Sequence, residues 1–256
     1  MFHKKSLGQH FLRSESALRK IVEAGHLSST DTVLEIGPGE GVLTELLLKQ
    51  AGKVIAIEKD DRLIPLLQQK FKSEIAEGAL ELIHADILNY ELGIMNYGNS
   101  YKVVANIPYY ITGAIIRKFL ESDRQPAAMV LLIQKEVAKR IVAKDGKESL
   151  LSISVKAYGT PSYIETVKAG AFSPPPKVDS AIIAIENISK KFFTGIHEEQ
   201  FFTFLKKGFA HPRKLLSSNL GVAPSKLSSC AVAEKARAEN LSLEHWRCLV
   251  ATPEHV

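Results

Sequence analysis

The chain has 256 residues, 45% of them hydrophobic and 24% charged, which is typical of one large globular domain or of one with a small appendage. No apolar run is as long as a membrane span and no N-terminal segment resembles a signal peptide, so we expect no membrane association and a cytoplasmic location. Cys230 and Cys248 fit no metal-ligand spacing, so reduced thiols and no metal are the default expectation. The net charge of +5 and the pI near 9.0 favour a polyanionic partner.

A basic arm opens the chain. Residues 1–13 contain no acid, and their basic side chains include His3, Lys4, Lys5 and Arg13. Three apolar residues indicate that the arm docks on the rest of the protein: Leu7, Phe11 and Leu12. Ser14 then fits the N-cap of a helix that ends near Gly25.

Residues 32–58 have the pattern of a strand, a glycine turn, a helix and a second strand. In order, these are 33–36, Gly37-Pro38-Gly39-Glu40-Gly41, 42–51 and 53–57. Such a unit binds a nucleotide-like ligand at the carboxyl ends of its strands, because the glycines let the backbone approach the ligand closely. Glu58 follows the second strand directly, where an acid can accept hydrogen bonds from both ribose hydroxyls.

The glycine spacing argues against a dinucleotide. A dinucleotide-binding fingerprint requires G-x-G-x-x-G, whereas the three glycines here give G-x-G-x-G. Pro38 and Glu40 place stiffness and negative charge where a pyrophosphate needs free N–H groups. With Glu35 and Glu58, Glu40 predicts an acidic pocket, which favours a cofactor that carries positive charge. S-adenosylmethionine, with its sulfonium and ammonium groups, fits this requirement.

Two later strand ends also carry polar side chains. A third strand at 80–84 leads to Asp86, which is expected to accept a hydrogen bond from the adenine amine of the cofactor. Taken alone, an Asp at such a position is more often a helix cap or a turn residue. A fourth strand at 101–105 leads to Asn106. Four successive strand ends therefore converge on one crevice of a doubly wound sheet.

The stretch Asn106-Ile107-Pro108-Tyr109-Tyr110 suits one flat nitrogen heterocycle. The amide oxygen of Asn106 and the carbonyl of Pro108 can accept the two hydrogens of an exocyclic adenine amine, which turns its lone pair toward an electrophile. Tyr109 can stack on the ring. For this string alone a strand-end turn with core tyrosines is the alternative, and the convergence of four strand ends favours methylation of a base.

The rest of the sheet-forming region alternates helices and strands. A helix is expected after an Asp61 cap, with Pro65 in its first turn. The later elements are a helix at 112–120, a strand at 127–133, a helix at 134–143, strands at 150–158 and 163–167, and a last strand at 178–185. Helix 134–143 carries three basic side chains: Lys135, Lys139 and Arg140. The sequence favours equally a role in contacting phosphates and a place on a solvated surface.

From about residue 190 the strand patterns stop and apolar helical faces follow. We therefore predict two domains, one at 1–188 that contains the sheet and one at 189–256 that is helical. No acid occurs between Gln200 and Ala233, where five basic residues gather: Lys206, Lys207, Arg213, Lys214 and Lys226. This stretch is expected to contact RNA phosphates.

Five motifs together resemble the ribosomal RNA adenine dimethyltransferases, with the erythromycin-resistance methylases as more distant relatives. They are Lys5-Ser6-Leu7-Gly8-Gln9-His10-Phe11-Leu12, Leu34-Glu35-Ile36-Gly37-Pro38-Gly39, Asn106-Ile107-Pro108-Tyr109, Phe172-Ser173-Pro174-Pro175-Pro176-Lys177-Val178-Asp179-Ser180 and Gly208-Phe209-Ala210-His211-Pro212-Arg213-Lys214. The resemblance implies an α/β fold, with a Rossmann-like S-adenosylmethionine-dependent methyltransferase sheet followed by a small all-α domain that binds RNA.

The resemblance also assigns residues to the cofactor and to the target base. It implies that S-adenosylmethionine contacts seven positions: His10, Leu12, Gly37, Gly39, Glu58, Asp86 and Asn106. It places an extruded adenine between Tyr109 and Phe172, whose rings offset the cost of unstacking the base, while a core position is the alternative for Phe172. Two residues depart from the family pattern: His10 stands where Asn is usual, and Pro212 interrupts the usual Arg-Arg pair.

The implied activity is dimethylation of the N6 amines of two adjacent adenosines in the 3′-terminal hairpin of 16S rRNA. The implied partners are the small ribosomal subunit and its rRNA, with a monomer as the default state. Two alternatives remain: an adenine methyltransferase acting on 23S rRNA or DNA, and a non-catalytic RNA-binding assembly or transcription factor. The intact set of Glu58, Asp86 and Asn106 argues against lost catalysis.

Overall fold

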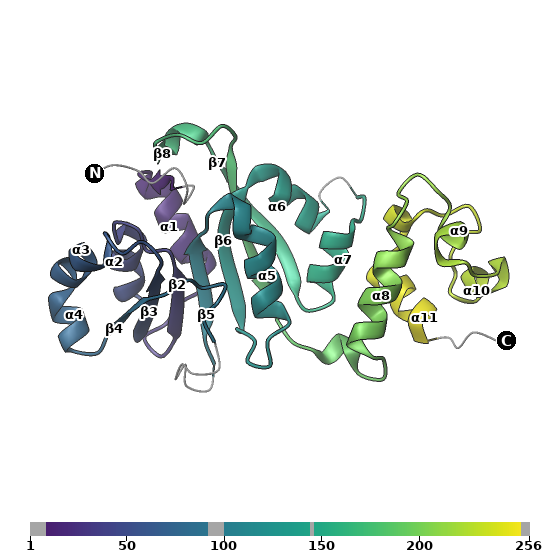
Figure 1. Ribbon diagram of the computed structural model, residues 1–256, viewed down its shortest axis with the longest axis horizontal. Helices are drawn as coiled ribbons and strands as arrows, with labels where there is room; N and C mark the ends of the chain where they lie inside the picture. The colour runs from purple at the N-terminus through teal and green to yellow at the C-terminus, as the bar shows by residue number, and fades with distance from the viewer. Residues whose placement is uncertain (1–8, 92–99, 144–145, 252–256) are drawn as a thin grey trace. The chain divides into compact units, whose positions relative to one another are not determined.

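The computed structural model describes residues 9–91, 100–143 and 146–251 (Figure 1). The chain forms two compact units, Met1–Ala138 with Ser162–Ile188, and Lys139–Pro161 with Ser189–Val256. The boundary predicted after residue 188 coincides with one passage of the chain between the units. The segment 139–161, which was expected in the first domain, lies in the second unit instead.

The position of this segment has a clear packing cause. The Tyr158 ring lies 5.1 Å from the Phe193 ring and 5.8 Å from the Phe202 ring, measured between centroids. Its hydroxyl also donates a hydrogen bond to Glu198. Aromatic packing of this kind buries a large apolar area, so Tyr158 attaches its segment to the helical unit.

Within the described residues, seven strands form a mixed sheet in the order β4-β3-β2-β5-β6-β9-β7 (Figure 1). Their bounds are β2 Thr32–Ile36, β3 Lys53–Glu58, β4 Leu80–His84, β5 Lys102–Asn106, β6 Ala128–Gln134, β7 Thr160–Val167 and β9 Ser180–Glu186. Neighbouring strands from β4 to β6 are parallel, and β9 is antiparallel to β6. The α/β fold predicted from the sequence is confirmed.

The strand order explains where a ligand can bind. The chain runs outward through β2, β3 and β4 and then returns to place β5 on the other side of β2. In doubly wound sheets, the crevice at such a reversal, outside the carboxyl ends of the strands, is the usual ligand site. The strand ends that carry Gly37, Glu58, Asp86 and Asn106 all meet this crevice.

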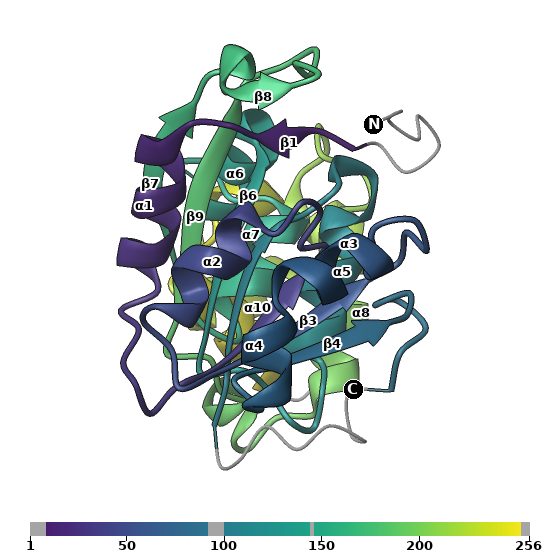
Figure 2. The ribbon, with the colours of Figure 1, turned by 90° about the vertical axis from the view of Figure 1, so that its left-hand side faces the viewer.

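Helices cover both faces of the sheet (Figures 1 and 2). They are α1 Glu15–Ala24, α2 Val42–Leu48, α3 Ile64–Lys70, α4 Lys72–Ala76 and α5 Thr112–Leu120. Apolar side chains of α1, α2 and α3 share one core with alternate strand residues such as Val33, Val54 and Val104, as the two-residue period of a strand requires. Helix α5 lies on the opposite face and buries an apolar stripe of its own.

Two helix starts test the predicted caps. The Ser14 hydroxyl accepts a hydrogen bond from the Ala17 N–H (3.3 Å) and caps α1, as predicted. The prediction of an Asp61 cap is wrong, because a turn occupies that position and α3 begins after Leu63. Pro65 does lie in the first turn of α3, where its missing N–H costs nothing.

The segment predicted as a strand at 150–158 is a helix instead. Helix α7 spans Leu150–Lys156 and starts at a reciprocal cap. The Ser152 N–H donates to the Ser149 hydroxyl (3.1 Å), and the Ser149 N–H donates to the Ser152 hydroxyl (2.6 Å). This cap and the burial of one apolar face outweigh the strand preference of the β-branched residues.

A two-stranded ribbon fastens the N-terminal arm to the Phe172 motif. Strand β1, Phe11–Leu12, pairs antiparallel with β8, Phe172–Ser173 (Figure 2). The Arg13 N–H extends the pairing by donating to the Ala171 carbonyl (2.7 Å). The expected docking of the arm is therefore confirmed for residues 9–13. Residues 1–8, including Leu7 and the basic His3, Lys4 and Lys5, lie outside the described residues.

The second unit contains α7 and four later helices, with α6 (Lys135–Val142) entering it from the first. The later helices are α8 Glu198–Gly208, α9 Leu216–Leu220, α10 Pro224–Ser229 and α11 Leu243–Ala251. Their core is centred on the buried ring of Trp246, which stacks on Phe209 with centroids 5.5 Å apart. In the described part of the chain, no helix is long and apolar enough to cross a membrane.

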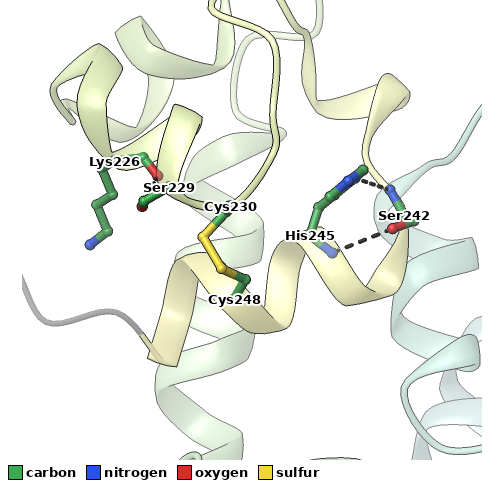
Figure 3. Close-up of a disulfide and its surroundings, with 6 residues drawn as sticks. All are labelled: Lys226, Ser229, Cys230, Ser242, His245 and Cys248. Atoms are coloured by element: carbon green, nitrogen blue, oxygen red, sulfur yellow. Dashed lines mark hydrogen bonds between the residues drawn. A yellow bond between two sulfur atoms is a disulfide. The ribbon is translucent and has the colours of Figure 1, made fainter.

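The two cysteines form a disulfide, contrary to the expectation of reduced thiols (Figure 3). Cys230 lies at the end of α10 and Cys248 lies on α11, with Cα atoms 5.7 Å apart. Beside them, the backbone N–H groups of Ser242 and His245 donate to each other's side chains and fix the start of α11. The cysteines thus join two helices that sequence spacing alone could not place side by side.

Candidate active site

A cavity of about 1220 Å³, including its open mouth, lies at the carboxyl ends of β2 to β5. All seven positions expected to contact the cofactor line it: His10, Leu12, Gly37, Gly39, Glu58, Asp86 and Asn106. Pro108 and Tyr109 line it as well. The structure thus brings the arm, four strand ends and the Asn106 stretch together around one space, all within the first unit.

The glycine turn after β2 has a backbone that side chains disfavour. Gly37, Gly39 and Gly41 have φ values of +66°, +61° and +74°, in the left-handed region. A Cβ atom on Gly39 would also come within 2.9 Å of the Phe11 ring. Glycine is therefore required at this turn for both backbone conformation and space, and the turn leaves its main chain open to a ligand.

Glu58 ends β3 as a buried carboxylate, 5% exposed, facing the cavity. The Gly39 N–H donates to its Oε2 (3.1 Å) and the Asp60 N–H donates to its Oε1 (2.8 Å). Burial raises the pKa of Glu58, and these backbone donors partly offset the rise. The Lys59 N–H is a third backbone donor to this carboxylate, and because a carboxylate has about four lone-pair sites, it retains capacity for a ribose hydroxyl.

The sequence overstates how acidic the cavity is. Glu35 is 1% exposed and accepts a hydrogen bond from the Thr44 hydroxyl (2.6 Å), and burial raises its pKa to about 8. Glu35 is therefore mostly neutral at pH 7. Glu40 forms an ion pair with Arg13 (2.6 Å), which neutralises a second predicted acid. Of these three acids, Glu35 is mostly neutral and Glu40 is paired with Arg13. The contacts of Glu58 come from backbone N–H groups, so Glu58 is the acid that contributes negative charge to the cavity.

Asp86, after β4, is held by two donors at the wall of the cavity. Lys59 donates to its Oδ2 (2.7 Å) and the Leu88 N–H donates to its Oδ1 (3.0 Å). Burial opposes the charged form, but the bond from Lys59 and the backbone bond outweigh it, so the pKa of Asp86 is lowered. The side chain is thus ionised and oriented, as an acceptor for an adenine amine must be.

Asn106 is oriented by the N-terminal arm. Its Nδ2 donates to the backbone carbonyl of His10 (3.3 Å), which leaves its Oδ1 as an acceptor. Pro108 leads into a short helix, Tyr109–Ile111, and its carbonyl accepts from the Ile111 N–H (3.2 Å). Because a carbonyl has two lone pairs, Pro108 can accept a second hydrogen bond from a ligand.

The two tyrosines after Pro108 differ in exposure. Tyr109 is half-buried, its hydroxyl hydrogen-bonds to that of Ser180 (2.6 Å), and burial raises its pKa, so the phenol stays neutral. Tyr110 also lines the cavity but is 62% exposed. No role was predicted for Tyr110, although two consecutive aromatic residues after a turn indicate that one of them faces solvent.

The burial of Phe172 bears on one prediction. Its side chain is 5% exposed, belongs to the core and is absent from the cavity lining. In the β1–β8 ribbon it is paired with Leu12, and paired residues project to the same side of a ribbon. Both side chains enter the same core. The burial of Phe172 favours the core alternative, and its place across an adenine from Tyr109 stays a prediction.

The seven residues expected to bind RNA lie on several elements. Lys135 belongs to the first unit and lies 3.8 Å from Asp179, whereas Lys139 and Arg140 on the same helix belong to the second unit. Four exposed side chains lie in or after the last turn of α8: Lys206, Lys207, Arg213 and Lys214. The last turn of a helix is electrostatically favourable for cations, so these lysines also have a local role.

The cavity fits S-adenosylmethionine. Gly37 and Gly39 place no side chain between their backbone and a ligand, and Glu58 and Asp86 offer oriented acceptors at successive strand ends. Together with the strand order, these features define a Rossmann-like S-adenosylmethionine-dependent methyltransferase. Residues 2–252 match the family described as ribosomal RNA adenine dimethylase, and the chain belongs to that family.

Individual relatives agree with this assignment. The chain is 47% identical to a ribosomal RNA small subunit methyltransferase A of Dehalococcoides mccartyi, over 97% of this chain and 88% of the relative. It is 38% identical to the protein of that name in Fusobacterium nucleatum, over 95% of each chain. A solved dimethyladenosine transferase from Plasmodium falciparum superposes with a TM-score of 0.81 at 28% identity, covering 94% of this chain and 96% of the other.

Proposed function

We propose that this protein transfers methyl groups from S-adenosylmethionine to the N6 amines of two adjacent adenosines in the 3′-terminal hairpin of 16S rRNA. The product is N6,N6-dimethyladenosine, formed during biogenesis of the small ribosomal subunit. One observation carries the proposal. The acceptors of Asn106 and Pro108 and the Tyr109 ring lie together in the cavity that also contains Glu58 and Asp86. The relatives named ribosomal RNA small subunit methyltransferase A support this choice of RNA.

The residues of this chain contribute positioning and electrostatics. The Asn106 Oδ1 and the Pro108 carbonyl accept the two hydrogens of the target amine, which frees its lone pair from conjugation with the ring. Tyr109 holds the ring from one face. When bound, S-adenosylmethionine supplies the electrophilic methyl group. A methylated, ammonium-like nitrogen on adenine is strongly acidic, so its proton can leave to water and we assign no general base.

The cofactor is proposed to be held by the opposite end of the cavity. Glu58 accepts the ribose hydroxyls, Asp86 accepts from the adenine amine, and Gly37 and Gly39 admit the cofactor close to the backbone. His10 and Leu12 close the space from the arm. Backbone donors fix the Glu58 carboxylate, so it is oriented to accept the ribose hydroxyls.

RNA binding is proposed for exposed basic side chains of the second unit. Lys206, Lys207, Arg213 and Lys214 are exposed in a stretch without acids, and each can neutralise a phosphate. The Pro212 departure lowers the charge of this motif by one. Because the proposed substrate is ribosomal, we also propose that the protein acts in the cytoplasm, as a monomer.

One specific observation favours a second candidate. The 23S rRNA methyltransferase ErmE superposes with a TM-score of 0.77 at 26% identity, over 94% of this chain and 98% of the other. Methylation of a large-subunit adenosine would use the same cavity. An RNA-binding assembly factor without catalysis is the remaining alternative.

The test is transfer of labelled methyl groups to small subunits that lack the modification, with large subunits, naked rRNA and DNA in parallel. Nucleoside mass analysis should find dimethyladenosine with the small-subunit substrate. Label in large subunits would instead support the 23S alternative. No transfer to any substrate, with RNA binding intact, would leave the assembly-factor function.

The RNA surface needs a separate, matched test. The Lys206→Glu/Lys207→Glu double variant should weaken RNA binding and reduce the slope of log affinity against log salt by about one for each phosphate that is no longer neutralised. Lys49→Glu, an exposed charge reversal at the end of α2, is the control and should leave the slope unchanged. Equal slopes for all three proteins would remove this surface from the RNA site.

A further inference from the structure

Asp60 is a buried carboxylate that no step of the proposed reaction uses. It lies two residues beyond Glu58, in the turn after β3, and its side chain has no exposed surface. The Arg62 guanidinium donates to both of its oxygens, from Nε to Oδ1 (2.8 Å) and from Nη2 to Oδ2. This fork holds the pKa of Asp60 well below its usual range, so the carboxylate is ionised. A second lone pair on each oxygen can still accept from another donor.

That donor comes from the N-terminal arm. The Gln9 Nε2 donates to Asp60 Oδ2 (2.8 Å), across 51 positions of the chain. A hydrogen bond to an ionised acceptor is about twice as strong as one between neutral groups. The other end of the described arm is held by β8, where the Arg13 N–H donates to the Ala171 carbonyl. Gln9 therefore fastens the arm to the turn after β3.

The residue that follows Gln9 orients a side chain of the cavity. The His10 carbonyl accepts from Asn106 Nδ2 (3.3 Å). Because an amide has one donor side and one acceptor side, this bond decides that Asn106 Oδ1 is the atom left to accept from a target amine. Consecutive Cα atoms are about 3.8 Å apart, so a displacement of Gln9 also displaces His10. The position of Gln9 thus controls the orientation of the Asn106 amide.

The backbone of Asp60 serves a different group from its side chain. Its N–H donates to Glu58 Oε1 (2.8 Å), whereas its carboxylate accepts from Gln9. A substitution at Gln9 leaves this N–H in place. The role of the carboxylate in holding the arm is therefore separable from the role of Glu58 in binding the cofactor.

We propose that Gln9 and Asp60 are positioning residues for methyl transfer, and that their hydrogen bond fixes the arm so that the His10 carbonyl holds Asn106 Oδ1 toward the target amine. Both residues act through Asn106 and not on the reacting atoms. All of these contacts lie within the first unit. The inference rests on the proposed function for the reaction, but it holds for whichever adenosine is methylated.

Four variants test this role. Gln9→Met keeps the length of the side chain and removes the donor, whereas Gln9→Lys keeps a donor for Asp60. Asn106→Ala removes the group through which the pair acts. Gln50→Met, at an exposed position just beyond α2, is the matched control. A thermal unfolding curve for each variant establishes that it is folded.

The first measurement is single-turnover transfer at saturating cofactor and RNA. Gln9→Met should lower the rate about 10-fold, less than the roughly 100-fold that a 1 Å misplacement of a reacting group can cost. Gln9→Lys should stay within about 3-fold of wild type, and Gln50→Met should be unchanged. In the Asn106→Ala background, Gln9→Met should cost less than about 2-fold, because residues that act through one group are not additive.

The second measurement requires no transfer. The side-chain amide resonance of Asn106, identified by its absence in Asn106→Ala, reports the hydrogen bond to His10. It should shift in Gln9→Met and keep its place in Gln9→Lys and Gln50→Met. A merely structural role for Gln9 would lower Tm and leave this resonance where it is.

Three results overturn the inference. The first is a Gln9→Met variant that transfers as fast as wild type, or that costs as much in the Asn106→Ala background as alone. The second is an Asn106 resonance unchanged in Gln9→Met, and the third is an equal loss of rate in Gln9→Lys and Gln9→Met. Failure of the proposed function is distinguishable, because the wild-type protein would then methylate no substrate, whereas the resonance is measured without one.

Discussion

The two ends of the cavity are built in different ways. At the cofactor end, Glu58 and Asp86 are each fixed by a backbone donor two positions further on, the Asp60 N–H and the Leu88 N–H. Each also accepts from a residue that follows a neighbouring strand, Gly39 for Glu58 and Lys59 for Asp86, 19 and 27 positions away. At the base end, the fixing contacts span the chain: 96 residues separate Asn106 from His10, and 164 separate His10 from Pro174. The cofactor end is therefore organised by turns at the ends of neighbouring strands, and the base end by contacts that span most of the chain. Substitutions at the two ends should accordingly have separable effects on cofactor affinity and on turnover.

The largest expected effect lies at the base end. Asn106→Ala removes one of two acceptors that act on the amine as its charge develops, so kcat should fall by about 10²–10³, the cost of losing one such group in other enzymes. Cofactor affinity should change much less, although the loss of the bond to His10 can cost a fewfold. Single-turnover transfer and calorimetry measure the two quantities separately.

The matched control for this change is Asn89→Ala. Asn89 is exposed three residues beyond Asp86, and its backbone N–H bonds to the Asp86 carbonyl, a contact that the substitution keeps. Near-normal turnover is expected for it. A comparable loss in both variants, or normal turnover in Asn106→Ala, would remove Asn106 from the chemistry and with it the contrast between the two ends.

The next effect lies at the cofactor end. In Glu58→Gln the amide nitrogen must face a backbone donor, either Gly39 N–H or Asp60 N–H, and that donor loses its partner. S-adenosylmethionine should bind about 10- to 150-fold more weakly, since hydrogen bonds to charged groups contribute about 1.5–3 kcal/mol. Turnover at saturating cofactor should remain near wild type. Glu45→Gln, at an exposed position on α2, is the control, and reduced kcat with intact affinity would contradict the assignment.

This difference also explains what could be predicted from the sequence. The glycine turn, Glu58, Asp86 and Asn106 follow strands whose apolar patterns are continuous, so periodicity placed them at one edge of the sheet. Once the strands are ordered as neighbours in one sheet, these residues lie at the same edge, and no information on distant contacts is needed to place them there. Local spacing was sufficient because the parallel strands share a direction.

Features that depend on distant pairing were missed. The burial of Phe172 follows from its pairing with Leu12, and the orientation of His10 follows from Pro174, and neither partner is near in sequence. The neutral state of Glu35 depends on how completely helix α2 covers it, as does its bond to Thr44. The wrong prediction of a strand at 150–158 has a different cause. The apolar content of this segment suits a strand or a helix, and the serine cap at its start favours the helix.

A smaller effect is expected at the mouth of the base end. Tyr110 is exposed at the cavity, so Tyr110→Ala should weaken binding of the RNA about 5- to 10-fold through loss of stacking with a flanking nucleotide. Stability and cofactor affinity should not change, because little of its side chain is buried. Filter binding of the hairpin measures this effect. Leu66→Ala, another exposed large side chain, serves as the control, and equal RNA affinity in both variants would show that the mouth contributes nothing.

The smallest effect concerns the buried acid beneath the cofactor end. The pKa of Glu35 is about 8 in the folded protein and near 4.5 when exposed, so the native state binds the extra proton and stability falls as pH rises between these values. Between pH 7 and 8 the loss is about 1 kcal/mol, equivalent to roughly 2–4 °C in Tm for a chain of this size. Glu35→Gln keeps an acceptor for Thr44 without a titrating group, so its Tm should lack this decrease when both proteins are measured without cofactor. Parallel Tm curves from pH 6 to 9 would mean that Glu35 is already ionised at neutral pH. The cofactor end would then carry the additional negative charge that its sequence suggests.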